Sequence, residues 1–205
     1  TLDGGVGADI LFGGNGGDTY YVDDVNDKVF EDDWYQSAKD TVISSASYSL
    51  SNNVENLTLA GTAAINATGN TLANELMGNT GNNSISGEDG NDTILGGGGK
   101  DTLAGGSGSD TFRFTATTDS STAQNDIITD FVTRTDKIDL LAIDANTSVA
   151  SDQAFTYIGA ASFSAAGQLR LIDNVLYGDV NGDKVADFQI ALTGVTSLES
   201  TDFVL

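Results

Sequence analysis

The sequence contains no cysteine, no histidine and only eight basic residues in 205. Without cysteine, the fold cannot rest on disulfide bonds. Without histidine, this chain contains no HExxH zinc site and no catalytic triad or Cys-His dyad. These absences exclude the commonest protease and esterase mechanisms from the chain itself.

Basic residues are outnumbered by thirty acidic ones, which gives a formal net charge of −22. Nucleic acids and anionic membrane surfaces are therefore poor partners, whereas cations are good ones. Without cations the carboxylates repel one another, so we expect a loose or unfolded cation-free state. Each bound ion stabilises the folded state against this repulsion, by about 1.4 kcal/mol when the free ion concentration is ten times Kd.

The sequence also lacks a transmembrane run and a signal peptide at its start. Apolar residues make up 39% of the chain and are spread evenly, which suffices for a thin core. The length suits one elongated domain or two small ones.

Three nine-residue units occupy residues 87–113, reading GEDGNDTIL, GGGGKDTLA and GGSGSDTFR. Each has aspartate at its sixth position and an apolar residue at its eighth. Glycines allow a positive φ and bring backbone carbonyls close together. The last three residues of each unit favour a strand whose central side chain points inward. Two units therefore form one coil of a solenoid, with a turn at each edge.

Stacked turns of this kind offer carbonyls and one carboxylate each, which are the hard oxygens that calcium prefers. An ion would lie between turns on the same edge, two units apart. This rule pairs Asp92 with Asp110 on one edge and Asp101 with Asn83 on the other. A disordered glycine-rich linker is the alternative, but it has no reason to keep a nine-residue phase.

The N-terminal part, residues 1–30, carries further units. Two of them, GGVGADILF and GGNGGDTYY, place Asp9 and Asp18 at the sixth position. The next, VDDVNDKVF, has lost its glycines but keeps Asp27 in phase as a partner for Asp9. Asp18 is left facing a truncated turn, because the chain starts with the last three positions of a unit. We therefore expect a fragment of a longer array.

Residues 31–68 break the period and form an irregular, degenerate part of the roll. They contain Trp34, Tyr35 and Tyr48, which we interpret as cap and core residues, with a sugar-binding patch as the alternative. The period returns over residues 69–114, where Asn74 and Asn83 replace aspartate. Their turns should bind calcium weakly or stack through amide hydrogen bonds.

Residues 115–205 have a different composition and predict an antiparallel β cap. We expect two strands around a polar turn at 126–131 and 136–141, and later strands that include a two-residue turn at Asp173 and Asn174. Cap residues such as Phe155, Tyr157 and Phe188 would be buried.

The loop 179–187 places Asp179, Asn181, Asp183 and Asp187 at a spacing seen in many calcium loops. It departs from the EF-hand pattern in its glycine position and in lacking the final glutamate. We expect a bound calcium here, with a plain polar hairpin loop as the alternative.

With the nonapeptides, the DIITDF and TDKIDL segments and the DFVL end, the chain resembles an RTX C-terminal region. Its last hundred residues are similar to the C-terminal domain of serralysin-type metalloproteases, and that domain is similar to the R-modules of secreted alginate epimerases. The resemblance implies an all-β fold, a right-handed parallel β-roll with an antiparallel cap. It also implies export from a Gram-negative cell by type I secretion machinery, using an uncleaved C-terminal signal. Phe203 departs slightly from the aliphatic serralysin ending.

In the family that the chain resembles, calcium is bound by carbonyls of positions one and three of one turn and of positions two and four of the turn two units on. The position-six carboxylates complete each site. Carried over, and with the loop at 179–187 added, the candidate ligands of several calcium ions are Gly4, Val6, Asp9, Asp18, Asp23, Val25, Asp27, Gly78, Thr80, Asn83, Gly87, Asp89, Asp92, Gly97, Gly99, Asp101, Gly106, Gly108, Asp110, Asp179, Asn181, Asp183 and Asp187.

We expect no catalytic residue in this chain, since the calcium register accounts for most aspartates and the glutamates show no pairing. The preferred function is a monomeric, calcium-dependent folding and secretion module of an upstream secreted metalloprotease or alginate epimerase. The alternative is a carbohydrate-binding module, which would add a polysaccharide to its partners. Neither function involves nucleic acid or a membrane.

Overall fold

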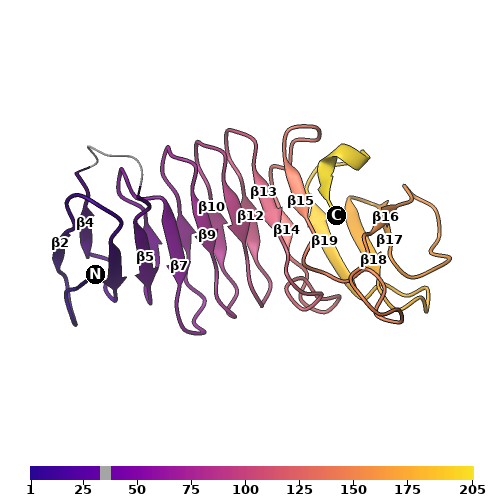
Figure 1. The fold of residues 1–205 in the computed structure, drawn as a ribbon, viewed down its shortest axis with the longest axis horizontal. Helices are drawn as coiled ribbons and strands as arrows, with labels where there is room; N and C mark the ends of the chain where they lie inside the picture. The colour runs from indigo at the N-terminus through magenta and orange to yellow at the C-terminus, as the bar shows by residue number, and fades with distance from the viewer. Residues whose placement is uncertain (33–37) are drawn as a thin grey trace.

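The computed structural model describes residues 1–32 and 38–205 and shows an all-β protein (Figure 1). The strands are short and stack side by side along the long axis, with the N-terminus near one end. In the described part of the chain, the single helical element is a 3-10 turn, η1, at Ser200–Asp202. No described helix is long and apolar enough to cross a membrane.

One side of the roll, called here the first sheet, is built entirely of parallel pairs. Its strands, in spatial order, are β1 (Leu2–Asp3), β3 (Thr19–Val22), β5 (Thr41–Ser44), β7 (Asn56–Leu59), β9 (Glu75–Met77), β11 (Thr93–Leu95), β13 (Thr111–Arg113), β15 (Lys137–Asp139) and β20 (Phe203–Val204).

The opposite side, the second sheet, contains β6 (Tyr48–Ser49), β8 (Ala67–Thr68), β10 (Ser84–Ser86), β12 (Thr102–Ala104), β14 (Ile127–Ile128), β19 (Phe188–Leu192), β18 (Val175–Asp179), β17 (Gln168–Ile172) and β16 (Thr156–Tyr157) in spatial order. It is parallel except for the β17–β18 and β18–β19 pairs, which form the antiparallel C-terminal part. A further parallel pair, β2 (Ile10–Phe12) with β4 (Lys28–Phe30), lies in the N-terminal part.

The strand register confirms the predicted coil of two units. Thr93 lies opposite Thr111, and Ser84 lies opposite Thr102. Inward side chains therefore stack on one another, and each buried aliphatic or aromatic side chain contributes about 1.5–3 kcal/mol. The stacks are Leu57, Leu76, Ile94, Phe112, Ile138 and Phe203 in the first sheet and Ala67, Ile85, Leu103, Ile128 and Leu192 in the second, all of them buried.

The irregular segment keeps both sheets although its sequence loses the period. Thr19 pairs with Thr41, 22 residues on, and Thr41 pairs with Asn56, 15 residues on. The turns absorb the difference in length while the strands stay stacked. Tyr48 is 7% exposed and belongs to the core, as interpreted from the sequence. Trp34 and Tyr35 lie outside the described residues.

The predicted strand pair at 126–131 and 136–141 is wrong. β14 pairs with β12 in the second sheet, whereas β15 pairs with β13 in the first. The two strands therefore add a coil to the roll and do not form a hairpin. The sequence misled because a short alternating run does not distinguish parallel from antiparallel pairing.

The C-terminal residues also belong to the roll, because β20 pairs in parallel with β15. The antiparallel part is confirmed for the hairpin of β17 and β18, whose turn residues Asp173 and Asn174 have φ of 51° and 63°. Such values are those of a two-residue turn that matches the twist of its strands. β16 departs from the predicted meander, since it pairs in parallel with β17.

Candidate calcium sites

One edge of the roll carries a ladder of sixth-position side chains, called here the first ladder. The Asn74 N–H donates to Asp92 Oδ1 over 2.7 Å, and the Asp92 N–H donates to Asp110 Oδ1 over 2.9 Å. The Asp110 N–H continues the series to Asp136 Oδ1 over 3.0 Å. All four side chains are buried. The structure thus brings Asp92 and Asp110 together on one edge, as the pairing rule predicts.

The other edge carries the second ladder. The Asn83 N–H donates to Asp101 Oδ1 over 2.7 Å, and the Asp101 N–H donates to Asp126 Oδ1 over 2.8 Å. Asp101 therefore has an aspartate neighbour on one side as well as Asn83 on the other. Sequence reasoning missed Asp126 and Asp136, since both follow insertions. The sequence did contain a signal for them. Asp126 and Asp136 each stand two residues before an apolar residue, as in a regular unit, although the glycines of the unit are missing.

Each ladder leaves carboxylate oxygens unused. Within the described residues, buried oxygens without a hydrogen-bond partner include Oδ2 of Asp9, Asp92, Asp101, Asp110 and Asp126. A buried, ionised carboxylate with an unpaired oxygen is strongly destabilising. Burial accordingly raises the pKa of Asp92 to about 7, that of Asp101 to about 6 and that of Asp126 to about 8. A cation beside these oxygens would remove that cost.

The glycine at the first position of a unit leaves room for this oxygen. A Cβ at Gly87 would lie 2.2 Å from Asp92 Oδ2 and 2.4 Å from the Gly105 carbonyl oxygen. A Cβ at Gly105 would lie 2.3 Å from Asp110 Oδ2. Because the clashing groups are buried, any side chain at these positions would displace the carboxylate and distort the turn.

The turns of the first ladder also keep the predicted carbonyl ligands available. Their stacking uses other carbonyls, since the Ser107 N–H donates to the Glu88 oxygen over 2.7 Å and the Gly90 N–H donates to the Ser107 oxygen over 2.9 Å. Within the described ranges, no backbone hydrogen bond between turns is accepted by the carbonyls of Gly87, Asp89, Gly106 and Gly108. Carboxylate and carbonyl oxygens here fit a calcium ion, which these residues would hold.

In the turns where asparagine replaces aspartate, the asparagine side-chain amide makes hydrogen bonds to the backbone. Asn74 Oδ1 accepts from the Asn70 N–H, and its Nδ2 donates to the Val54 and Glu55 carbonyls. Asn83 Oδ1 likewise accepts from the Asn79 N–H. Gly78 and Thr80 lie in the Asn83 turn, and Gly97 and Gly99 lie in the Asp101 turn next to it, so the Asn83 and Asp101 site has one neutral member. Amide hydrogen bonds are present at these turns, and weak calcium binding there stays a prediction.

Asp9 and Asp27 also come together, because the Asp9 N–H donates to Asp27 Oδ1 over 2.8 Å. Asp27 Oδ2, however, accepts from the N–H groups of Asp23 and Asp24. Val6 and Val25 are 98% and 66% exposed, so they could contribute through their carbonyls alone, as could Gly4. This pair is less open to an ion than Asp92 with Asp110.

Two family models match the chain. The model for the peptidase M10 serralysin C terminal matches residues 17–205, and that for the RTX calcium-binding nonapeptide repeat (4 copies) matches residues 1–29. The chain belongs to the peptidase M10 serralysin C-terminal family. The RTX repeats of this serralysin C-terminal chain imply calcium as its cofactor.

A similar solved structure is the AlgE6R3 subunit of the Azotobacter vinelandii mannuronan C5-epimerase, in solution. It has a TM-score of 0.50 and 26% sequence identity, over 72% of the present chain and 82% of that one. A search of curated proteins gave no match. The expected likeness to serralysin C-terminal domains and epimerase R-modules is thus confirmed.

In the serralysin C-terminal chain, the loop 179–187 closes on itself. Asp179 accepts from the N–H groups of Gly182 and Lys184, over 2.7 and 3.0 Å. Asp187 accepts from the Val180 N–H and from Asn181 Nδ2. Asn181 Oδ1 accepts from the Asp183 N–H. These bonds hold the loop oxygens in place, and the bound calcium expected here from the sequence stays a prediction.

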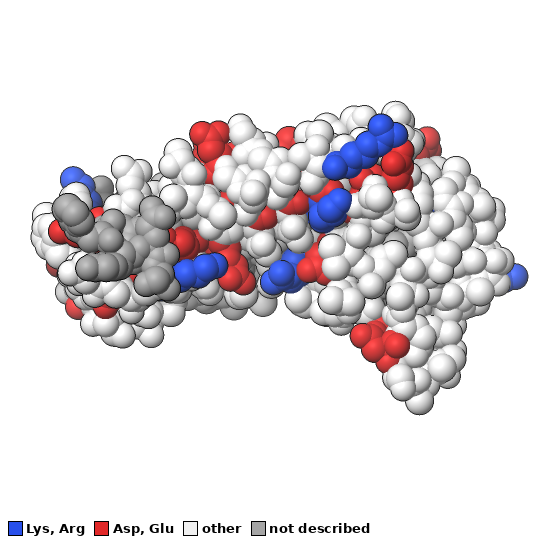
Figure 2. Space-filling view, turned by 45° about the horizontal axis from the view of Figure 1, so that its top comes forward, with Lys and Arg blue, Asp and Glu red and all other residues white. Residues whose placement is uncertain are grey.

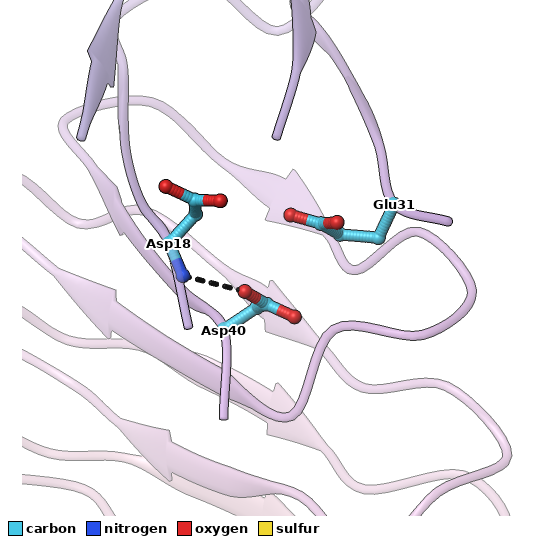
Figure 3. A group of neighbouring side chains, drawn as sticks. All are labelled: Asp18, Glu31 and Asp40. Carbon is cyan, nitrogen blue, oxygen red and sulfur yellow. Dashed lines mark hydrogen bonds between the residues drawn. The ribbon is translucent and has the colours of Figure 1, made fainter. Parts of the chain in front are cut away.

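A separate acidic cluster, drawn in Figure 3, joins Asp18, Glu31 and Asp40. One ligand oxygen from each lies within 4.8 Å of the others, and in the described ranges no other group of three or more acidic residues comes this close. The Asp18 N–H donates to Asp40 Oδ1 over 2.6 Å. Asp18 Oδ1 lies 3.3 Å from the Thr1 ammonium. Sequence reasoning missed Glu31 and Asp40.

Burial raises the pKa of Glu31 to about 7, and the charges of Asp40 and Asp18 add to this effect. Burial and the neighbouring charges thus disfavour the ionised state of Glu31. Glu31 occupies the first position of the next nine-residue unit, where a regular unit has glycine.

Proposed function

We propose that this chain is a non-catalytic C-terminal module of a larger secreted enzyme, which folds when calcium binds outside the cell. The observation that carries the proposal is the pair of ladders, in which Asp92, Asp101, Asp110 and Asp126 each present a buried oxygen without a partner among the described residues. Where calcium is scarce, these carboxylates repel and keep the chain unfolded and threadable. Where calcium is abundant, ligation neutralises them and the roll forms.

Unfolding of the calcium-free chain would show directly in its size. An unfolded chain of 205 residues has a radius of gyration of about 50 Å, against about 17 Å for a compact domain and somewhat more for an elongated one. Small-angle scattering in chelator and then in millimolar calcium should show the radius fall between these limits. A small, unchanged radius in chelator would overturn the proposal.

We also propose that the C-terminal end carries the type I secretion signal. Phe203 is 8% exposed and packs into the first sheet, and buried Asp202 accepts from the Arg134 N–H. In the folded chain this end is therefore part of the roll. The exporter would meet it only before folding, which supports export of the unfolded chain.

Co-expression with a type I exporter tests the signal. The whole chain should reach the medium, and the chain without residues 200–205 should stay in the cells. A variant with Val204, which is 37% exposed, changed to alanine serves as the control that keeps the strand. Equal export of the truncated chain would remove the signal from the proposal without touching calcium-driven folding.

Polysaccharide binding is a second candidate, favoured by the structural similarity to a subunit of a mannuronan C5-epimerase. Against it, Arg113 pairs with Asp139 over 3.0 Å and approaches Glu75, and the basic residues in Figure 2 stand apart, several beside acidic ones. Titration with mannuronan oligosaccharides in excess calcium should give heat if a calcium-bridged site exists. No heat would exclude this candidate.

A further inference from the structure

The strand pairing on the second-sheet side of the roll is interrupted between β4 and β6. Among the described strands, β4 pairs only with β2, and the second sheet begins at β6. On the opposite side of the same coil the first sheet is continuous, since β3 pairs with β5. The break therefore separates the β2–β4 pair, at the N-terminal end of the roll in Figure 1, from the rest of that side.

A groove follows this break. It consists of two adjoining hollows of about 290 and 410 Å³, which share Lys28 and Ser51 in their walls. Tyr48 and Ser49 of β6 line the first hollow, and Phe30 of β4 lines the second. Each hollow approaches the size of a small-molecule site, about 300–1,000 Å³. Two of them in succession suit a chain of linked units better than a single small molecule.

Phe30 offers an aromatic face to the groove. Its ring stacks on that of Phe12, with the ring centroids 5.1 Å apart and 17° between the planes. Phe12 belongs to β2, so it covers one face of Phe30, and the groove that Phe30 lines takes the other. The two side chains, Phe12 and Phe30, are 68% and 48% exposed. Exposed apolar rings that are already held in one orientation indicate a binding surface.

Small hydroxyl and amide side chains make up much of the remaining lining. Ser49, Asn52 and Thr68 line the groove, and in the described part of the chain their side chains make no hydrogen bond. Such groups both donate and accept hydrogen bonds. The face of an aromatic ring is negative and attracts the C–H groups of a sugar ring. Polar groups beside an aromatic face therefore match a sugar, which has hydroxyls at its rim and C–H groups on its faces.

The charge of the groove favours an uncharged ligand. Lys28 is the one basic residue among the described residues that line it, and Asp27 and Glu31 are acidic. In a chain with a net charge of −22, a single ammonium beside two acids does not attract a polyanion. Within the described ranges Lys28 forms no ion pair, so its ammonium is available to a sugar hydroxyl.

We propose that the groove between β4 and β6 binds a neutral polysaccharide, with one sugar ring stacked on Phe30 and its neighbours hydrogen-bonded to Ser49, Asn52 and Thr68. The ligand differs from the mannuronan considered above, which is a polyanion that calcium would have to bridge. The site goes beyond calcium-driven folding, because it needs only that the N-terminal part of the chain is folded.

Affinity electrophoresis in native gels tests the groove. The gels contain millimolar calcium and, one at a time, a soluble neutral glucan, mannan or galactan. The acidic chain moves through such gels by its own charge, and a neutral polymer slows it by binding. The variants are Phe30→Ala, Ser49→Leu and, as a matched control, Tyr21→Ala, since Tyr21 is a similarly exposed aromatic residue on the first sheet. Circular dichroism checks that every variant is folded.

At least one polymer should slow the parent chain. Phe30→Ala should weaken this binding about tenfold, because it removes the stacked ring. Ser49→Leu should weaken it by filling the groove, and Tyr21→Ala should bind like the parent. Mannuronan oligosaccharides should not release the chain from the neutral polymer, and release by them would overturn the neutral class of ligand.

A folded parent chain that no polymer slows would overturn the site and leave calcium-driven folding intact. Equal slowing of the Phe30→Ala and Tyr21→Ala variants would overturn the site in the same way. Slowing that persists in gels with chelator would support the groove, and it would contradict calcium-driven folding instead.

Discussion

At the scale of the residue, four of the ladder aspartates use their two oxygens for two different tasks: Asp92, Asp101, Asp110 and Asp126. In Asp110, Oδ1 accepts the Asp92 N–H and so sets the distance between coils, while Oδ2 stays buried and without a partner in the described chain. Asn74 contacts the preceding coil in a different way, because its Nδ2 donates to the Val54 and Glu55 carbonyls while its Oδ1 accepts from Asn70 in its own turn. The second task is calcium binding, which a negative charge strengthens, so asparagine in this place should bind calcium more weakly than aspartate.

Asp110→Ala should raise the calcium concentration at the folding midpoint by an order of magnitude or more, since the change removes one charged ligand from each neighbouring step. Asp152→Ala is the matched control, because Asp152 lies in the C-terminal part, away from both ladders, and is exposed. Circular dichroism during calcium titration gives both midpoints. Equal midpoints would contradict the pairing of Asp92 with Asp110.

The second ladder gives a prediction about coupling. If Asp101 and Asp126 share one ion, then Asp101→Asn and Asp126→Asn should each weaken calcium binding, and the double variant should be little worse than either. Calorimetric titration of the three variants measures the three affinities. Additive losses would mean that the two carboxylates serve separate ions.

Proton binding should act oppositely in the calcium-free chain and in the calcium-loaded one. Burial raises the pKa of Asp92 to about 7 and that of Asp126 to about 8 in the fold, from a reference of 3.8. A carboxyl whose pKa rises on folding favours the folded state at low pH, and this contribution is lost as pH rises through the folded pKa. The calcium-free chain should therefore show more β structure by circular dichroism at pH 5 than at pH 8.

With calcium present, protons compete with the ion for the same oxygens, so the calcium midpoint should rise as pH falls from 8 to 5. Calcium-free spectra that do not vary over this range would show that burial of these carboxyls does not limit folding.

Single residues were predictable from the sequence where the nine-residue phase held. The pairing of Asp92 with Asp110 follows from counting two units. Asp126 lies 25 residues after Asp101, and Asp40 lies 22 residues after Asp18. Insertions of such lengths shift the count, so only the folded chain reveals these partners.

At the scale of the element, a coil is defined by its three-residue strands and not by the length of its turns. Residues 87–113 give both strand and turn from the sequence, because glycine, aspartate and the inward apolar residue recur together. β14 and β15 keep only the strand signal, which is why their place in opposite sheets was not predictable. Both strands join the core stack because their inward side chains, Ile128 and Ile138, are fully buried in it.

Ile94→Ala should cost about 2–5 kcal/mol in the free energy of unfolding, because it opens a cavity in the stack between Leu76 and Phe112. Leu95→Ala, one residue on, changes an outward and partly exposed side chain and should cost much less. Urea unfolding in saturating calcium measures both. Similar losses would contradict the inward stack.

At the scale of the whole molecule, the fold is an elongated stack whose coils contact mainly their neighbours (Figure 1). Such solenoids fold by propagation from any stable part. A net charge of −22 opposes this propagation until cations bind. In the C-terminal part, Phe155 packs edge-on against Phe188, and β17, β18 and β19 are the longest described strands, so we expect the roll to nucleate there.

The most direct test of calcium-driven folding is a far-ultraviolet circular dichroism titration of the whole chain, first in chelator and then with calcium up to millimolar concentrations, with magnesium as the control ion. The ladders predict a disordered spectrum in chelator and at neutral pH, and a cooperative gain of β signal with calcium that magnesium does not produce at the same concentration. A β spectrum in chelator that calcium leaves unchanged would contradict the account.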